Sequence, residues 1–287
     1  MPKFYLRGFC VPGSEHIWVG DLKTRKSYAA NIADVGVEND FYSDAGGVHE
    51  DDLEVRLSKI ESAAAPKLRG FLRGETGIDP DLGRFIAWLA ARTTWLRRVV
   101  QETFPDFLRA NTELLRQESG AENEVFDFEH ISTGHRELLP LSNALVRLQD
   151  STWRMHVPQD YHLHAIRMQA WLLREKHFPK LEWTKLTAPA DCYFITSDRP
   201  VSWDIAGDSV ADHPAAFGHQ SVELTVPLCS GHALVAVHDR STLAKKQLIT
   251  VSAINERTRT NAERFIYGAR EEDVEVYLEQ LRVQQIN

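Results

Sequence analysis

The chain has 287 residues, of which 43% are hydrophobic and 26% are charged, and its formal net charge is −8. These values are ordinary for a globular protein that is long enough to bury a sizeable core. The acidic balance argues against a protein that binds nucleic acid through bulk charge. A local basic cleft, for instance from the arginine-rich residues 92–98, would still allow nucleic acid as a partner.

The cysteines and the first residues of the chain bear on its compartment. Cys10, Cys192 and Cys229 lie far apart, and none belongs to a C-x-x-C pair. This pattern favours neither a disulfide framework nor a structural zinc site. The start of the chain lacks the apolar region of a signal peptide, and no uncharged apolar run is long enough to span a bilayer. We therefore expect a cytoplasmic location and no membrane partner.

Residues 1–48 are predicted to form a small N-terminal β-unit. Residues 16–22 are rich in β-formers, residues 23–26 resemble a polar turn, and residues 27–32 are a candidate return strand. A two-stranded unit is too small to be stable alone. We therefore expect these strands to join a sheet with strands from the C-terminal part of the chain.

Residues 49–178 are predicted to be mostly helical. Apolar residues recur at helical spacing from Leu53 to Ala64, and this helix is expected to end near Pro66. A second helix is predicted to start with Asp79 as N-cap and Pro80 at the first helical position. Pro105 is expected to interrupt the helical pattern. Further helices are predicted over residues 107–115, 138–148 and 161–178.

Residues 179–287 are predicted to contain strands followed by helices. Strands are expected at residues 181–186, 192–196, 222–228 and 233–238, and helices at residues 254–267 and 271–284. The run 192–196 is the most apolar short run in this half, so we expect it to be a central strand. The whole pattern predicts one α+β domain over residues 1–287, with a mostly antiparallel sheet from both ends of the chain and a helical middle layer.

Several strong catalytic signatures are missing from the sequence. It contains no P-loop, no G-x-G-x-x-G, no H-E-x-x-H and no G-x-S-x-G. Their absence sets aside many common enzyme classes. Candidate chemistry must therefore come from side chains that folding brings together.

The most distinctive candidate is Asp198, which follows the apolar run 192–196 and Ser197. Pro200 prevents continued pairing there, and a rigid strand tip is a suitable place for a metal ligand or a base. The alternative is that Asp198 and Ser197 satisfy backbone groups of a turn.

Two further carboxylates are candidate metal ligands. Asp40 precedes two aromatic residues, which indicates either a pocket edge or a turn aspartate beside core aromatics. Glu61 shares one helix face with Glu54 and Ser58, and such a face either binds a divalent cation or is simply solvated. A metal site is therefore predicted from Asp40, Glu61 and Asp198, with Mg²⁺ or Mn²⁺ as the ion if the protein is an enzyme.

Arg92 is the candidate contact for a phosphate. It follows a run of small and aromatic residues, so we expect it to be half-buried and to need a carboxylate or phosphate partner. An internal salt bridge and a substrate contact are both consistent with this setting.

An ordered set of short segments resembles one bacterial family, the domain of unknown function numbered 4238. The set spans nearly the whole chain and comprises Phe4-Tyr5-Leu6, the Trp18 strand, Asp40-Phe41-Tyr42, residues 57–61, Phe85-Ile86 with Arg92-Thr93, residues 194–200, Pro227-Leu228 and Ile254-Asn255. The family often begins with His-His-x-Val-Pro, whereas this chain begins Met1-Pro2-Lys3. The resemblance implies a common fold and names no reaction.

Two functions are consistent with these residues. The first is a metal-assisted hydrolase of the phosphodiesterase or nuclease type, with Asp198, Glu61 and Arg92 as the catalytic residues. The second is a non-catalytic sensor or accessory binding protein in a bacterial defence or stress system, such as antiphage defence. The two hypotheses differ in whether folding gathers Asp40, Glu61 and Asp198 in one cleft.

Overall fold

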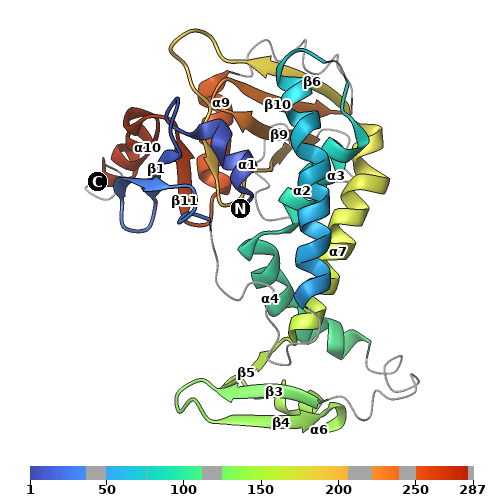
Figure 1. Ribbon diagram of the computed structural model, residues 1–287. Helices are drawn as coiled ribbons and strands as arrows, with labels where there is room; N and C mark the ends of the chain where they lie inside the picture. The colour runs from blue at the N-terminus through green and yellow to red at the C-terminus, as the bar shows by residue number, and fades with distance from the viewer. Residues whose placement is uncertain (37–49, 76, 112–124, 206–221, 239–249, 284–287) are drawn as a thin grey trace. The chain divides into compact units, whose positions relative to one another are not determined.

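The computed structural model describes residues 1–36, 50–75, 77–111, 125–205, 222–238 and 250–283 (Figure 1). Helices and antiparallel sheets together give the predicted α+β class. The chain divides into two compact units. Unit 1 comprises Met1–Phe41, Asp51–Thr93 and Gln169–Asn287, and unit 2 comprises Tyr42–Glu50 and Thr94–Met168. A single domain over the whole chain stays a prediction.

The first sheet of unit 1 joins strands from both ends of the chain. Its order is β2-β1-β11-β7, with all neighbours antiparallel. The strands are β1 (His16–Asp21), β2 (Lys26–Asn31), β7 (Thr196–Ser197) and β11 (Phe265–Gly268). Helix α10 (Glu271–Val283) contacts β1, β2 and β11 (Figure 1). The expected pairing of N-terminal strands with C-terminal strands is therefore confirmed.

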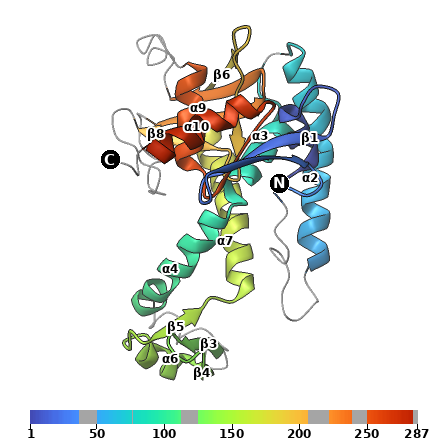
Figure 2. The same ribbon diagram turned by 90° about the vertical axis from the view of Figure 1, so that its left-hand side faces the viewer.

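A second sheet of unit 1 contains C-terminal strands only. Its order is β6-β10-β9-β8, and the strands are β6 (Glu182–Thr187), β8 (Ser202–Ile205), β9 (Val222–Cys229) and β10 (His232–Val237). The central strands β9 and β10 are buried over nearly their whole length, which fits the apolar sequence of β10, whereas β9 also buries Glu223 and Thr225. Helix α9 (Val251–Asn261) contacts β7 of the first sheet and β8 of the second (Figure 2).

The remaining helices of unit 1 come from the start and the middle of the chain. They are α1 (Lys3–Leu6), the 3-10 turn η1 (Arg7–Phe9), α2 (Glu50–Leu72), α3 (Pro80–Ala91), the π-turn η3 (Leu173–His177) and the 3-10 turn η4 (Phe178–Lys180). Helix α3 begins as predicted, because the Asp79 carboxylate accepts a hydrogen bond of 2.9 Å from the Asp81 N–H. Helix α2 instead continues past Pro66 to Leu72, so its predicted end was wrong.

Unit 2 has a small hydrophobic core of its own. It contains α4 (Thr94–Ala110), β3 (Val125–His130), β4 (Arg136–Pro140), α6 (Leu141–Arg147), β5 (Trp153–His156) and the greater part of α7 (Gln159–Leu172). The strands form an antiparallel sheet of order β4-β3-β5. Its core includes Phe104, Leu108, Phe126, Phe128 and Leu141.

The sheet of unit 2 was not expected in a helical middle. Phe126 and Phe128 alternate with polar residues along β3, which is the period of a half-buried strand. The run is short, so its signal is weak beside the long helical patterns around it. Pro105 lies inside α4, which therefore continues through the position where an interruption was predicted.

Two further observations concern the helices and the cysteines. Among the residues that the structure describes, no helix combines the length and the apolar character needed to cross a membrane. The thiols of Cys10, Cys192 and Cys229 are free.

Candidate functional site

Asp198 follows β7 directly and is hydrogen-bonded to the backbone of the segment that enters β11. Its Oδ1 accepts from the Glu263 N–H at 2.9 Å, and its Oδ2 accepts from the Arg264 and Phe265 N–H groups at 2.8 and 2.9 Å. Its own N–H donates to the Phe265 carbonyl at 3.0 Å. Burial raises the pKa of the Asp198 carboxyl above its ordinary value, although the three N–H donors act in the opposite direction. Asp198 thus fastens β11 to β7.

Two asparagines of α9 extend this network to the segment before and after Asp198. Asn255 accepts from the Ile195 N–H at 3.0 Å and donates to the Tyr193 carbonyl at 2.9 Å. Asn261 donates to the carbonyls of Arg199 and Val201, at 2.8 and 3.0 Å. We call Asp198, Asn255 and Asn261 the polar latch.

The polar latch explains why the expected central strand at residues 192–196 is absent. Only Thr196–Ser197 pair as a strand, and β7 lies at an edge of its sheet. The Asn255 side chain bonds the Tyr193 carbonyl and the Ile195 N–H, and the Phe194 N–H donates to the Ser230 carbonyl at 2.8 Å, so these buried backbone groups are paired without a second strand. The expectation of a central strand was therefore wrong, although Phe194 and Ile195 are fully buried as predicted from their apolar character.

Glu61 and Arg92 form an ion pair within unit 1. Glu61 lies on α2, and Arg92 is the residue at which α3 ends. The Arg92 Nη1 donates to the Glu61 Oε1 at 3.0 Å, and the two side chains are 14% and 27% exposed, respectively. This is the internal salt bridge that the sequence offered as one alternative for Arg92.

Two of the three predicted metal ligands, Glu61 and Asp198, lie within the described residues. Asp40 lies outside the described residues. Within the described ranges, no three His, Cys, Asp or Glu side chains gather closely enough to hold a metal ion. Asp198 is bonded to the backbone at β11, and Glu61 is paired with Arg92. Their assignment as a metal site stays a prediction.

A groove in unit 1 lies away from these residues. It consists of two adjoining cavities of about 200 and about 270 Å³. They share the lining residues Phe71, Glu75, Gly77 and Ile78. The first cavity is completed by Lys67, Asp79 and Leu82, and the second by Gly74, Trp183, Thr184 and Lys185. We call this feature the α2–β6 groove.

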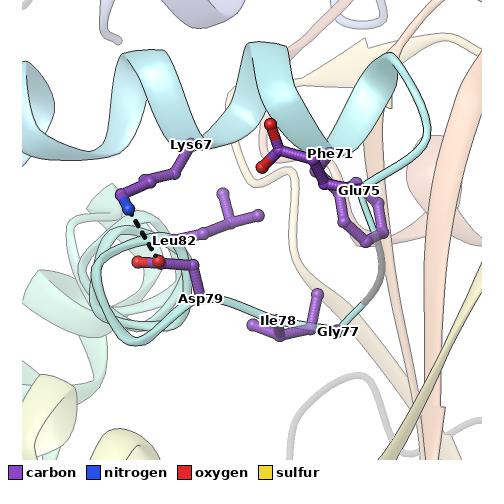
Figure 3. Close-up of a pocket in the computed structure, with 7 residues that line it drawn as sticks. All are labelled: Lys67, Phe71, Glu75, Gly77, Ile78, Asp79 and Leu82. Atoms are coloured by element: carbon purple, nitrogen blue, oxygen red, sulfur yellow. Dashed lines mark ion pairs between the residues drawn. The ribbon is translucent and has the colours of Figure 1, made fainter.

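The first cavity is built where α2 gives way to α3. Figure 3 shows Lys67 and Phe71 projecting from α2 and Asp79 standing at the start of α3. Gly74 and Gly77 have φ values of +115° and +84°, a region that glycine adopts without steric cost. These glycines let the chain leave α2 and turn back into α3, and the turn leaves the cavity between the two helices.

Charged groups of the groove differ in how they are paired. Lys67 Nζ lies 3.0 Å from Asp79 Oδ2, and this contact raises the pKa of Lys67. Lys185 Nζ donates to the Phe71 carbonyl at 3.0 Å and lies 5.1 Å from the centre of the Phe71 ring. Among the described residues, neither Glu75 nor Lys185 has an ion-pair partner. The groove thus presents one carboxylate and one ammonium that are not neutralised by an ion pair.

Aromatic rings form the apolar part of the groove. Phe71 lines both cavities and is 7% exposed, so its ring is a fixed wall. Trp183 lines the second cavity and packs edge-to-face on Phe178, with ring centres 5.1 Å apart. An aromatic wall beside an unpaired carboxylate suits the apolar stem and charged head of a lysine or arginine.

Sequence reasoning did not identify the groove. Its lining residues come from α2, from the connection to α3 and from β6, and they follow no local motif. The signal that was present is the trio Gly70, Gly74 and Gly77 before the Asp79-Pro80 helix start. That trio indicates a turn with unusual backbone angles, but it does not indicate which strand completes the cavity.

The protein is thus an α+β protein that contains the polar latch and the α2–β6 groove. Residues 1–272 match the family described as protein of unknown function (DUF4238). The chain belongs to this family, as the resemblance predicted. No curated protein and no solved structure matches the chain.

Proposed function

We propose that this chain is a binding protein whose ligand presents a cationic group to Glu75 in the α2–β6 groove. The observation that carries the proposal is the Glu75 carboxylate, which lines both cavities and has no ion-pair partner among the described residues. A carboxylate left without a partner in a concave site gains interaction energy when a cation enters.

The three residues of the hydrolase hypothesis are engaged in contacts within the fold. Asp198 accepts three backbone hydrogen bonds, and a carboxylate used in this way has little capacity left for a metal or a substrate proton. Glu61 and Arg92 satisfy each other. The contacts of these three residues are therefore accounted for by the fold. The hydrolase stays a prediction, as does a place in a defence or stress system.

The shape of the groove limits the ligand group to a modest size. Cavities of about 200 and about 270 Å³ are smaller than the pockets that enclose drug-sized ligands. A single long side chain or a small organic cation is the appropriate scale. Phe71 and Trp183 would cover its apolar part while Glu75 pairs with its charge.

The test uses N-acetyl-arginine N-methylamide, a small molecule that carries an arginine side chain on an uncharged backbone. Titration followed by amide NMR shifts is expected to move the signals of Gly74 and Gly77, which line the groove. The norleucine analogue lacks the charge and is expected to bind about 2- to 5-fold more weakly, because a partly exposed ion pair contributes about 0.5–1 kcal/mol.

Two variants decide the outcome. Glu75→Gln keeps the shape and removes the charge, so it is expected to weaken the arginine probe to the level of the norleucine analogue. Glu54→Gln is the matched control, because Glu54 is an exposed carboxylate on α2 that does not line the groove. If Glu75→Gln binds the arginine probe as tightly as the wild type, or if the shifts occur away from the groove, the proposal is wrong.

A further inference from the structure

We infer that the α2–β6 groove receives an extended peptide segment of another protein, which adds as a strand to the outer edge of β6 and inserts a lysine or arginine side chain beside Glu75. This inference rests on the proposed function and specifies the ligand class. Strand addition combines main-chain hydrogen bonds along an edge with pockets for alternate side chains. Both elements are present in unit 1.

The groove meets β6 along its edge. Trp183, Thr184 and Lys185 are consecutive, and all three line the second cavity. Successive side chains of a strand point to opposite faces of a sheet. A cavity that touches three successive residues runs along the strand and does not meet one of its faces through alternate side chains alone.

The outer edge of β6 has no strand beside it in the described part of the chain. β6 stands first in the order β6-β10-β9-β8, and β10 is the one strand beside it among the described residues. In an antiparallel pair, alternate residues direct both N–H and C=O away from the partner. The edge thus offers a row of donors and acceptors to an incoming strand.

Lys185 does not obstruct this edge. An edge lysine often prevents unwanted strand pairing by placing its charge in the path of another strand. Here the Lys185 ammonium is held by the Phe71 carbonyl and lies over the Phe71 ring. Its charge is therefore directed toward α2, and Trp183 to Leu186 remain half-buried without a covering strand.

The Glu75 carboxylate favours a basic side chain, while the Lys185 ammonium of the same cavity is held at the Phe71 carbonyl. Lys67 is neutralised by Asp79, whereas the charge of Glu75 is not. The contact with Asp79 is the main cause of the raised pKa of Lys67, and the charge of Glu75 makes a smaller contribution in the same direction. A basic side chain that enters from the β6 edge would reach this carboxylate past Phe71, which lines both cavities.

The experiment uses the peptide acetyl-Thr-Val-Arg-Val-Thr-amide on the full chain, with affinity measured by fluorescence anisotropy of a labelled copy. Two N-methylated forms separate main-chain from side-chain binding, one methylated at both valines and one at the arginine and the last threonine. Because alternate N–H groups face β6, one form is expected to lose roughly 10- to 30-fold in affinity and the other less than about 3-fold. Hydrogen exchange of residues 182–187 is expected to slow when the unmethylated peptide binds.

The outcomes separate this inference from the proposed function. Glu75→Gln is expected to weaken the peptide about 3- to 5-fold, whereas Glu54→Gln leaves it unchanged. Equal affinity of the two methylated forms, or no binding of the peptide, overturns strand addition. The proposed function survives that result if the acetyl-arginine probe still requires Glu75. Slow exchange of residues 182–187 without peptide, together with a dimer mass in light scattering, would assign the edge to a second copy and also overturn the inference.

Discussion

The polar latch and the α2–β6 groove are two polar regions of unit 1 that treat their charged groups differently. In the latch, every contact of the Asp198 carboxylate is made with backbone N–H groups of its own chain. In the groove, Glu75 has no ion-pair partner among the described residues. A carboxylate bonded by its own backbone stabilises the fold, whereas the exposed carboxylate of Glu75, in a concave site, is open to a ligand. We therefore expect changes at Asp198 to alter stability and changes at Glu75 to alter binding.

The largest effect is expected from the latch. Asp198→Ala removes the acceptor of three N–H groups, and we expect it to lower the free energy of unfolding by about 3–4 kcal/mol. Asp198→Asn retains one acceptor oxygen and places an amide against a donor, so about half of that loss is expected. Urea denaturation measures both changes.

The control for Asp198 is Asp191→Asn. Asp191 is exposed and has a φ of +64°, a conformation that asparagine also tolerates. The Asp191→Asn variant should therefore have the same free energy of unfolding as the wild type. An Asp198→Asn variant as stable as the wild type would contradict the structural role. It would return Asp198 to the list of candidate ligands or bases, and the comparison between latch and groove would fail.

An intermediate effect on stability is expected from the protonation of Asp21, which lies at the end of β1. Burial raises the pKa of this carboxyl, but hydrogen bonds from Arg264 and from the N–H groups of Thr24 and Lys23 outweigh burial and lower the pKa to about 2. The ordinary value is 3.8, so the folded state binds this proton less readily than the unfolded state. The resulting stability is present above about pH 4 and is lost as the pH falls through about 2.

The size of this effect is about 1–2 kcal/mol, because Arg264 is 48% exposed and its charge is partly screened. Urea midpoints measured between pH 5 and pH 2 for the wild type and for Asp21→Asn should converge at the acidic end. Asp34→Asn, at an exposed position, should keep the full wild-type pH dependence. Parallel curves for the wild type and Asp21→Asn would contradict the assignment.

The smallest effect sharpens the comparison, because stability and binding should change in opposite directions. Gly70 lies within α2, and a Cβ there would fall on the carboxylate oxygens of Glu75. Gly70→Ala is expected to raise the free energy of unfolding by up to about 1 kcal/mol through helix propensity. The displaced Glu75 should bind the acetyl-arginine probe about 3-fold more weakly.

Gly83→Ala is the matched control in α3. Its Cβ would meet only Ile78 Cγ2 at 3.6 Å, an ordinary contact. It should gain similar stability without loss of probe affinity. If both variants bind the probe like the wild type, the position of the Glu75 carboxylate does not matter to the groove.

Local patterns in the sequence predicted many elements of this fold. The Asp79-Pro80 start of α3 was correct because an N-cap acts within one helical turn. The prediction of residues 271–284 as a helix agrees with α10 at Glu271–Val283. The predicted helix over residues 254–267 was too long, since α9 ends at Asn261 and β11 begins at Phe265. The apolar residues near the end of this run fit the period of a strand as well as that of a helix, because the run is short.

The roles of the charged residues were decided by tertiary structure. The sequence placed Asp198 after an apolar run, but its three donors lie 65–67 residues further along the chain. Lys185 reaches a carbonyl 114 residues away. The chemistry of a carboxylate or an ammonium depends on which groups lie within a few ångströms of it. Local sequence sets helix starts and strand periods over a few residues, whereas those neighbours are chosen by the packing of distant segments.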